Sequence, residues 1–173
     1  MKKITIAIDG HSSCGKSTMS KELARQLGYV YVDTGAMYRA MAYYLLKQGV
    51  NGDEEEQVGR FCEGADITIC YENGEQVVLL NGENVNAFLR TEEVGNMASV
   101  SSANPKVREH LLKLQRTLAA SNDVVMDGRD IGTTILPNAE VKIFLTASAK
   151  TRANRRYLEL TEKGEACDMD EIL

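Results

Sequence analysis

The stretch that most constrains this chain runs from Gly10 to Ser17, between an apolar run, Ile4 to Ile8, and an amphipathic run that starts near Lys16. Its letters, GHSSCGKS, match the phosphate-loop pattern G-x-x-x-x-G-K-[ST] at every fixed position. Such a loop surrounds anionic oxygens with backbone N–H groups, and the following helix N-terminus adds about half a positive charge. We expect Lys16 to reach the β- and γ-phosphates of a nucleotide and the Ser17 hydroxyl to bind Mg²⁺. An ordinary glycine-rich turn is the alternative, and it leaves the apolar strand and the Lys-Ser pair unexplained.

Length and composition indicate one domain in a reducing compartment. A chain of 173 residues can bury one sizeable core but not two independent ones. The net charge of −5 argues against a nucleic acid polymer or an anionic membrane as the main partner. The first apolar run is too short for a signal peptide or a membrane span, so we expect a cytoplasmic location and a monomer. No C-x-x-C pair occurs, which favours free thiols over zinc or disulfides at Cys14, Cys62, Cys70 and Cys167.

The residues after the phosphate loop predict the first unit of an α/β fold. A helix is expected over Lys16 to Leu27 with Gly28 as its left-handed cap, and Tyr29 to Val32 forms a second buried strand. Such a unit crosses over with a right hand and places both strands in one parallel sheet. We therefore expect a parallel sheet with helices on both faces and a ligand at the carboxyl ends of the strands.

A polar stretch, Asp33 to Arg39, leaves the second strand at that same edge of the sheet. Thr34 is expected to cap the following helix, which continues to about Lys47. Capping alone would account for Asp33 and Thr34, and a solvated helix face would account for Arg39. The neighbouring phosphate loop favours a functional interpretation of this stretch.

The region from about 51 to 90 interrupts the alternation of strands and helices. A short acidic helix around Glu54 to Cys62 precedes two strands within 66–80, which Asn73-Gly74 joins as a hairpin. Asn81-Gly82 predicts a second turn into a third short strand. This antiparallel insert has no large core of its own, so we interpret it as a mobile flap or substrate-side lobe.

Two helices are predicted after the insert. Thr91 to Ser101 forms the first, and Asn104-Pro105 starts the second with a cap and a proline at the first helical position. An apolar stripe at helical spacing is expected to be buried and to leave Arg108 free to face elsewhere. The stripe consists of Val107, Leu111, Leu114 and Leu118.

A charged loop, Asp127 to Asp130, follows an apolar strand at 123–126. In phosphate-loop proteins an acid at this place can hold the water shell of Mg²⁺, and a nearby arginine can neutralise charge on the transferred phosphoryl group. A polar turn with an internal ion pair is the alternative. Three charges around Gly128, at the carboxyl edge of the sheet, favour a functional role.

A further buried strand, Val141 to Leu145, precedes a helix from about Ser148 to Lys163. Three arginines on one face of this helix could clamp ATP phosphates, or they could form a solvated face paired with Glu159 and Glu162, which spacing alone slightly favours. They are Arg152, Arg155 and Arg156. Only four core strands are predicted where such a sheet usually has another, so we expect a C-terminal portion to be missing beyond Leu173.

Taken together and in order, four stretches make the chain resemble the cytidylate kinase family along essentially its whole length. The phosphate loop is shared by many nucleotide enzymes, whereas the other three stretches are specific. The insert also resembles the extra sheet of this family's monophosphate-binding lobe, so we expect a single nucleoside monophosphate kinase domain over 1–173. The four stretches are Ile8–Thr18, Asp33–Arg39, Arg90–Arg108 and Asp127–Asp130.

This resemblance implies ATP-dependent, Mg²⁺-assisted transfer of a γ-phosphoryl group to CMP or dCMP. It gives catalytic roles to Lys16 and Arg129 and places Mg²⁺ on Ser17. The ATP phosphates would be bound by Gly10, His11, Ser12, Ser13, Cys14, Gly15, Lys16, Ser17 and Thr18, with Arg152 and Arg156. The acceptor would be bound by Thr34, Tyr38, Arg39, Ser99, Arg108, Asp127, Arg129 and Asp130. Among these, the residues expected to read the cytosine edge are Ser99, Arg108 and Asp130.

The chain departs from the family pattern in two places. Relatives usually carry Pro, Gly and Ala where this loop has His11, Ser13 and Cys14, which reduces the backbone freedom at Ser13. The remaining lid of the family, with further acceptor contacts, would lie beyond Leu173.

Other functions remain open at this point. Within enzymes, the chain could phosphorylate another nucleoside monophosphate or a small metabolite such as shikimate. It could instead be a nucleotide-binding regulatory module without turnover, although it lacks the N-K-x-D motif of GTPases.

Overall fold

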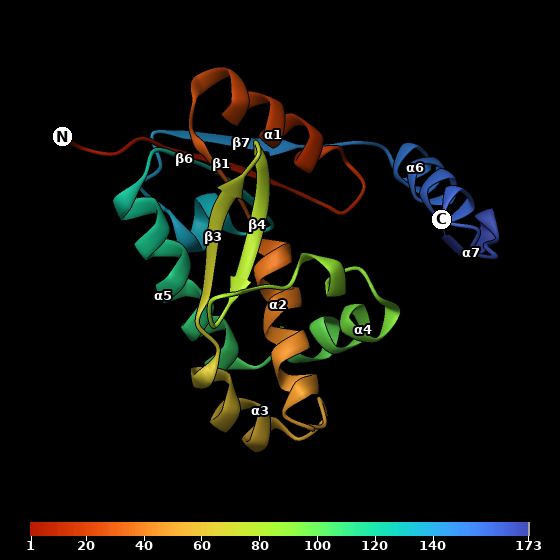
Figure 1. Ribbon diagram of the computed structural model, residues 1–173. Helices are drawn as coiled ribbons and strands as arrows, with labels where there is room; N and C mark the ends of the chain where they lie inside the picture. The colour runs from red at the N-terminus through yellow and green to blue at the C-terminus, as the bar shows by residue number, and fades with distance from the viewer. Residues whose placement is uncertain (173) are drawn as a thin grey trace.

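A computed structural model describes residues 1–172 and places a four-stranded parallel sheet at the centre of the molecule (Figure 1). The strand order is β2-β6-β1-β7. The α/β class and all four predicted core strands are confirmed. Their bounds are β1 (Thr5–Gly10), β2 (Val30–Asp33), β6 (Val124–Gly128) and β7 (Val141–Leu145).

The register of the sheet aligns the carboxyl ends of its strands. Asp33 of β2 lies beside Asp127 of β6, and Asp9 of β1 lies beside Gly128. On the other side of β1, Gly10 pairs with Leu145 of β7. The phosphate loop and the charged loop therefore leave neighbouring strands at the same edge.

Helices cover both faces of this sheet, as predicted. α1 (Lys16–Leu27) packs on one face, where Ala24 lies in a cluster with Ile8 and Val125. α2 (Thr34–Lys47) and α5 (Pro105–Ser121) pack on the opposite face (Figure 1).

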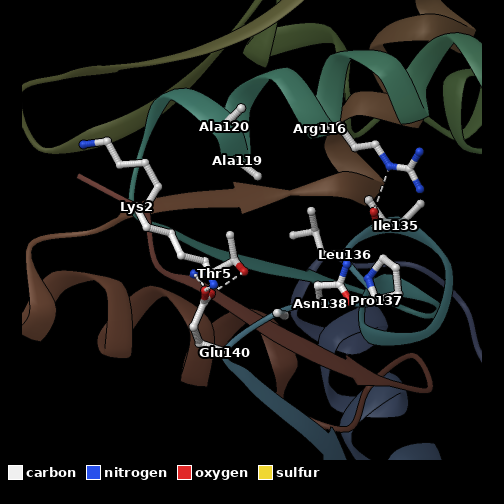
Figure 2. Close-up of a pocket in the computed structure, with 12 residues that line it drawn as sticks. Lys2, Thr5, Arg116, Ala119, Ala120, Ile135, Leu136, Pro137, Asn138 and Glu140 are labelled. Atoms are coloured by element: carbon white, nitrogen blue, oxygen red, sulfur yellow. Dashed lines mark hydrogen bonds and ion pairs between the residues drawn. The ribbon is translucent and has the colours of Figure 1, made fainter.

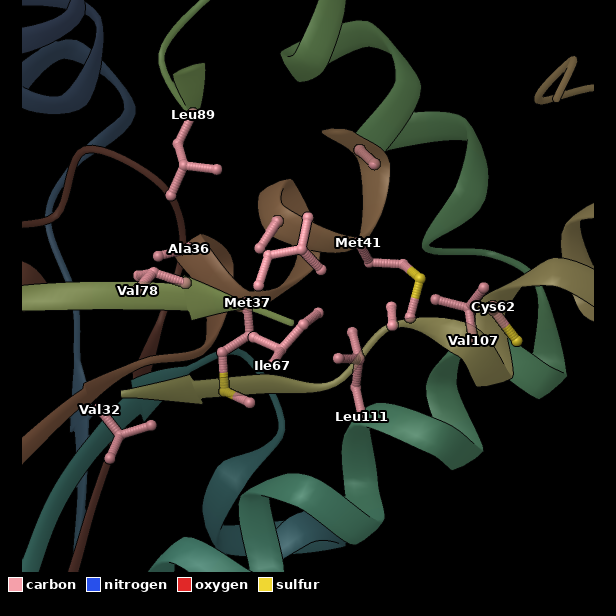
Figure 3. Close-up of a cluster of buried hydrophobic side chains, with 14 of the residues drawn as sticks. Val32, Ala36, Met37, Met41, Cys62, Ile67, Val78, Leu89, Val107 and Leu111 are labelled. Atoms are coloured by element: carbon pink, nitrogen blue, oxygen red, sulfur yellow. The ribbon is translucent and has the colours of Figure 1, made fainter. Parts of the chain in front are cut away.

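The larger hydrophobic core joins α2 and α5 to the insert. Met37 and Met41, about one helical turn apart on α2, are fully buried. Figure 3 shows them among Ile67 of the insert and Val107 and Leu111 of α5. The insert and the central sheet therefore share one core. Burying each such side chain stabilises the fold by about 1.5–3 kcal/mol.

The insert is a three-stranded antiparallel sheet in the order β3-β4-β5. Both predicted turns are confirmed: Asn73 and Gly74 have φ of 53° and 79°, and Asn81 and Gly82 have φ of 49° and 83°. These left-handed pairs suit the right-handed twist of a hairpin. The strands are β3 (Ile67–Glu72), β4 (Glu75–Leu80) and β5 (Glu83–Asn84), flanked by α3 (Glu55–Phe61), η1 (Cys62–Gly64) and η2 (Asn86–Phe88).

Four further helices complete the described chain. They are α4 (Glu92–Ser101), the π-helical turn η3 (Ile131–Ile135), α6 (Ala149–Glu162) and α7 (Met169–Ile172). In Figure 1, α6 and α7 lie beyond the end of β7, away from the other helices. Within residues 1–172, no helix is both long enough and apolar enough to span a membrane.

Three sequence expectations were wrong in detail. β7 was expected to be buried, but it is an edge strand whose residues are exposed or half-buried, with Phe144 64% exposed. Asp33, and not Thr34, caps α2: its Oδ1 accepts the N–H of Ala36 at 3.1 Å, because β2 continues through Asp33. On α5 the buried stripe continues from Leu111 to Gln115 and Ala119, so that the predicted leucines at 114 and 118 are only half-buried.

Candidate active site

The phosphate loop leaves the N-terminus of α1 open to an anion. Gly15 occupies the cap position with φ 96°, a conformation that favours glycine, and it has no side chain to bond the first-turn amides. Lys16 and Ser17 follow it, so the first turn begins with a cation and a hydroxyl. Because the first N–H groups of a helix lack partners within the helix and carry partial positive charge, this end attracts phosphate oxygens.

Close packing under the loop explains the first glycine of the motif. A Cβ atom at Gly10 would collide with the carbonyl oxygen of Leu145 and lie 3.0 Å from Cys14 Sγ. Cys14 is buried. Ser13 adopts φ 60°, a left-handed conformation that glycine favours, so the loop holds this conformation without a glycine.

Lys16 lies across the loop. Its Nζ donates to the carbonyl oxygen of His11 at 2.8 Å. The ring of His11 packs edge-on against Phe144 of β7, with 6.3 Å between ring centroids. The amine of Lys16 thus lies over the loop whose amides would bind phosphate. Ser12, Ser17 and Thr18 are exposed beside it.

Asp127, at the end of β6, is a buried carboxylate. Tyr31 donates its hydroxyl proton to Asp127 Oδ2 at 2.8 Å, and the Thr34 hydroxyl donates to the Asp127 carbonyl oxygen at 2.7 Å. Burial raises the pKa of the Asp127 carboxyl to about 6, and the charge of Asp33 raises it further, while the Tyr31 hydrogen bond and the charge of Lys16 act in the opposite direction. This site therefore concentrates negative charge that a cation would offset.

The residues here fit a magnesium ion that arrives with nucleotide phosphates. Mg²⁺ takes oxygen ligands and is usually bound by one or two carboxylates or hydroxyls together with phosphates and water. Ser17 and Asp127 supply such oxygens beside the loop. Within residues 1–172, no group of three or more His, Cys, Asp or Glu side chains could hold a metal ion without a substrate.

Arg39 of α2 and Arg90 lie close enough for the charge of one to act on the other. Arg39 is mostly buried, and its Nη2 lies 3.5 Å from Asp33 Oδ2. Burial lowers the pKa of Arg39; the Asp33 carboxylate opposes this, and the positive charge of Arg90 adds to it. In the described part of the chain, Arg39 Nε is buried without a hydrogen-bond partner. The two guanidinium groups are donors suited to a phosphate, and the carboxylates of Asp33 and Asp127 both act on the charge of Arg39.

Sequence reasoning gave Arg90 no role. Arg90 is the first residue of the stretch Arg90–Arg108, which carries part of the family resemblance. Its place in that stretch is the signal that could have identified it.

Arg108 and Asp130 form an ion pair, a contact that the sequence did not predict. Arg108 Nη2 donates to Asp130 Oδ2 at 3.0 Å, which ties α5 to the charged loop. Tyr38 lies beside them: burial raises the pKa of its phenol, Arg108 lowers it and Asp130 raises it. Ser99 does not join this group. It is exposed on α4, and its hydroxyl makes no hydrogen bond within the described residues.

Asp9 holds the charged loop in place, a role that the sequence did not reveal. Its buried carboxylate accepts the backbone N–H groups of Ile131 at 2.7 Å and Gly132 at 2.8 Å. These amides start η3, directly after Arg129 and Asp130. The Arg129 side chain is exposed and has no ion-pair partner among residues 1–172, so it is available to a ligand.

The three arginines of α6 have different surroundings. Arg155 Nη1 donates to the carbonyl oxygen of Ser13 at 3.3 Å, so this arginine contacts the phosphate loop. Arg156 pairs instead with Glu159 at 3.0 Å, which is the solvated arrangement that spacing favoured. Arg152 is half-buried, and its Nε has no partner within the described residues.

The hollow shown in Figure 2 lies away from this site. It has a volume of about 380 Å³ and is lined by Lys2, Thr5, Arg116 and Glu140, among others. Thr5 begins β1, and Glu140 directly precedes β7, so the hollow is at the amino-terminal edge of the sheet. The candidate active site is at the opposite edge.

A family model described as cytidylate kinase matches residues 6–173. The chain belongs to the cytidylate kinase family. The cytidylate kinase of Caldicellulosiruptor bescii is 50% identical over 173 residues, which make up 100% of this chain and 76% of that protein. The cytidylate kinase of Bacteroides fragilis strain YCH46 is 49% identical over 178 residues, covering 100% of this chain and 78% of the relative. That of Geobacter sp. strain M21 is 45% identical over 170 residues, covering 98% and 73%.

Membership confirms the resemblance that the four sequence stretches carried. In this member of the family, a parallel phosphate-loop core is combined with a small antiparallel sheet. ATP is the co-substrate that a kinase of this family implies.

Proposed function

We propose that this chain transfers the γ-phosphoryl group of ATP to CMP or dCMP, releasing ADP and CDP or dCDP. The observation that carries the proposal is the ion pair between Arg108 of α5 and Asp130 of the charged loop, in a cytidylate kinase family member. The charged loop leaves β6, the strand next to the one that leads into the phosphate loop. A donor site and a base-reading site then lie at one edge of the sheet.

On the donor side, the amides of the loop and α1 would bind the ATP phosphates. Lys16 would exchange its hydrogen bond to the His11 carbonyl oxygen for one to a phosphate oxygen. Its positive charge would then stabilise the negative charge that develops during the transfer. Arg155, which contacts the loop, joins Arg152 and Arg156 as a candidate for holding the ATP phosphates when α6 approaches them.

On the acceptor side, the guanidinium groups of Arg39, Arg90 and Arg129 would hold the monophosphate. Arg108 and Asp130 would present a donor and an acceptor to the cytosine edge, and Ser99 would join them only after α4 moves. Tyr38 and Thr34 would line the space between. A polar site rejects a wrong base because its buried groups would be left unpaired.

The reaction needs little covalent chemistry from side chains. A phosphate acceptor already carries a nucleophilic oxygen, so no general base is required, and positioning with charge neutralisation supplies most of the rate. When bound through Ser17 and waters ordered by Asp127, Mg²⁺ would neutralise charge on the ATP phosphates. We propose further that the protein works as a cytoplasmic monomer, which sedimentation at assay concentration tests.

The test is coupled ADP release with a panel of acceptors: CMP, dCMP, UMP, AMP and shikimate. We expect CMP and dCMP to be preferred, and equal turnover of AMP and CMP would contradict the cytosine assignment. Binding of ATP without acceptor-dependent ADP release would favour a nucleotide-binding regulatory module instead.

A matched pair of variants ties turnover to the loop. Lys16→Ala should lower kcat by about a hundredfold or more, whereas Lys21→Ala, an exposed lysine later on α1, should retain parental turnover.

A further inference from the structure

A tyrosine of the insert closes the open edge of the core sheet. β2 is an edge strand, so the backbone groups on its outer side have no neighbouring strand. The Tyr71 hydroxyl accepts the backbone N–H of Tyr31 at 2.6 Å and donates to the Tyr31 carbonyl oxygen at 2.8 Å. One phenol of β3, whose ring is 43% exposed, thereby satisfies both outward backbone groups of Tyr31.

The side chain of Tyr31 continues this connection into the donor site. Tyr31 pairs in register with Val125, so Asp127 lies two residues farther along the neighbouring strand and on the same face. The ring of Tyr31 is 4% exposed and packs beneath α1. Its hydroxyl donates to Asp127 Oδ2 at 2.8 Å, so Tyr71 is joined to Asp127 by hydrogen bonds at the two ends of Tyr31 and by the covalent frame of Tyr31 between them.

The same insert carries a group of the acceptor side. After β5 the chain passes through η2 to Arg90, whose charge acts on Arg39. Tyr43 of α2 stacks on Phe88 of η2 with 4.9 Å between ring centroids and an angle of 2° between the rings, which holds this segment against α2. The insert thus contacts the donor half through Tyr71 and supplies Arg90 to the acceptor half.

We propose that Tyr71 and Tyr31 are positioning residues for phosphoryl transfer, through which the insert sheet fixes the orientation of the Asp127 carboxylate. The reaction they serve is the proposed function, whereas the link itself rests on the hydrogen bonds alone. Protection of the β2 edge is the simpler role for Tyr71. That role needs neither the Tyr31 hydroxyl nor Asp127, so the two explanations predict different results.

The kinetic test uses Tyr31→Phe, Tyr71→Phe and the double variant, with Tyr29→Phe as the matched control. Tyr29 is half-buried in the same cluster, and its hydroxyl makes no hydrogen bond within the described residues. We expect Tyr31→Phe to lower kcat about tenfold with KM for CMP within about twofold, and Tyr71→Phe to lower kcat about threefold. Because both act through one carboxylate, the double variant should lose no more than Tyr31→Phe alone. The control should match the parent.

A second measurement needs no turnover. Hydrogen exchange in the absence of substrates should be faster across residues 127–132 in both Tyr31→Phe and Tyr71→Phe, and unchanged there in Tyr29→Phe. If Tyr71→Phe only lowers the unfolding temperature and speeds exchange within β2 and the hairpin, edge protection is its whole role and the link is overturned. Additive losses of kcat in the double variant would overturn it as well.

These outcomes separate the link from the proposed function. A parent chain that does not phosphorylate CMP contradicts the proposed function, and the exchange pattern at 127–132 still decides whether the insert controls Asp127.

Discussion

The carboxylate of Asp9 accepts the backbone N–H of Ile131 at 2.7 Å, across 122 positions of sequence, and its second oxygen accepts the N–H of Gly132 at 2.8 Å. Asp9 directly precedes the phosphate loop, and Ile131 directly follows Asp130. One buried side chain therefore fixes the donor loop and the charged acceptor loop relative to each other.

Replacing Asp9 with asparagine should break this arrangement. An amide has one acceptor oxygen, so its NH₂ group would face one of the two backbone donors, and a buried N–H would lose its partner. We expect a loss of about 2–3 kcal/mol in the free energy of unfolding, measured by urea denaturation, together with a fall in kcat. Asp123→Asn is the control: among residues 1–172 its carboxylate accepts the N–H of Ile4 alone, and an amide oxygen can replace it. Equal losses in both variants would contradict the two-amide argument.

The elements of this fold could be predicted because their signals are local. Asn73-Gly74 specifies a left-handed turn, Asn104-Pro105 specifies a helix start, and both act within a few residues. The cap of α2 was misplaced by one residue because Asp33 and Thr34 can both cap a helix. Only the tertiary bond from Thr34 to the Asp127 carbonyl oxygen separates their roles.

The site could be predicted only in part, for a related reason. Arg108 and Asp130 could each be identified from a motif, but their ion pair was not predicted, and their role in base recognition stays a prediction. The contacts of Asp9, Tyr31 and Tyr71 join segments that are distant in sequence, and nothing in the spacing of those residues indicates which strands become neighbours. The order β2-β6-β1-β7, which makes β2 an edge strand, creates these contacts.

The ionised carboxylate of Asp127 should lower the free energy of unfolding at neutral pH. The folded pKa, about 6, lies above the ordinary value of 3.8, so the folded protein keeps a proton that the unfolded chain releases between these values. The resulting stabilisation is present below pH 3.8 and is lost as pH rises through 6. Two pH units at about 1.4 kcal/mol each make Asp127→Asn more stable than the parent by about 3 kcal/mol at pH 7.5.

Urea denaturation in EDTA, from pH 4 to pH 8, measures this difference. The gap between the two proteins should shrink towards pH 4, because Asp127 of the parent is then protonated in the fold. A gap that does not change with pH would contradict the assignment. The same variant should lose kcat, since an amide cannot carry the charge that orders the waters of the metal ion.

Arg108→Ala should weaken the choice of base more than the reaction itself. Without the guanidinium, Asp130 loses its partner at 3.0 Å and the cytosine edge loses a donor. We expect kcat/KM for CMP to fall about ten- to a hundredfold, mostly through KM, and the ratio of CMP to UMP turnover to fall with it. Lys113→Ala removes an exposed cation from the same helix, where it pairs only with Glu109, and should preserve both values. A variant that keeps the parental CMP to UMP ratio would remove Arg108 from base recognition.

Ser13→Gly tests the unusual phosphate loop. Ser13 has φ 60°, and a left-handed conformation costs a residue with a side chain about 1–2 kcal/mol. Glycine removes that cost but adds about 0.4–1 kcal/mol of conformational entropy to the unfolded chain. The net expectation is a gain of about 0–1.6 kcal/mol in the free energy of unfolding, with ATP affinity unchanged, because the loop already holds the conformation that glycine would adopt. Thermal unfolding and calorimetric titration with ATP measure the two quantities. If both results hold, the left-handed backbone of Ser13 is strained and its side chain has no part in ATP binding. A weaker ATP affinity in the glycine variant would instead assign the Ser13 side chain a direct part in phosphate binding.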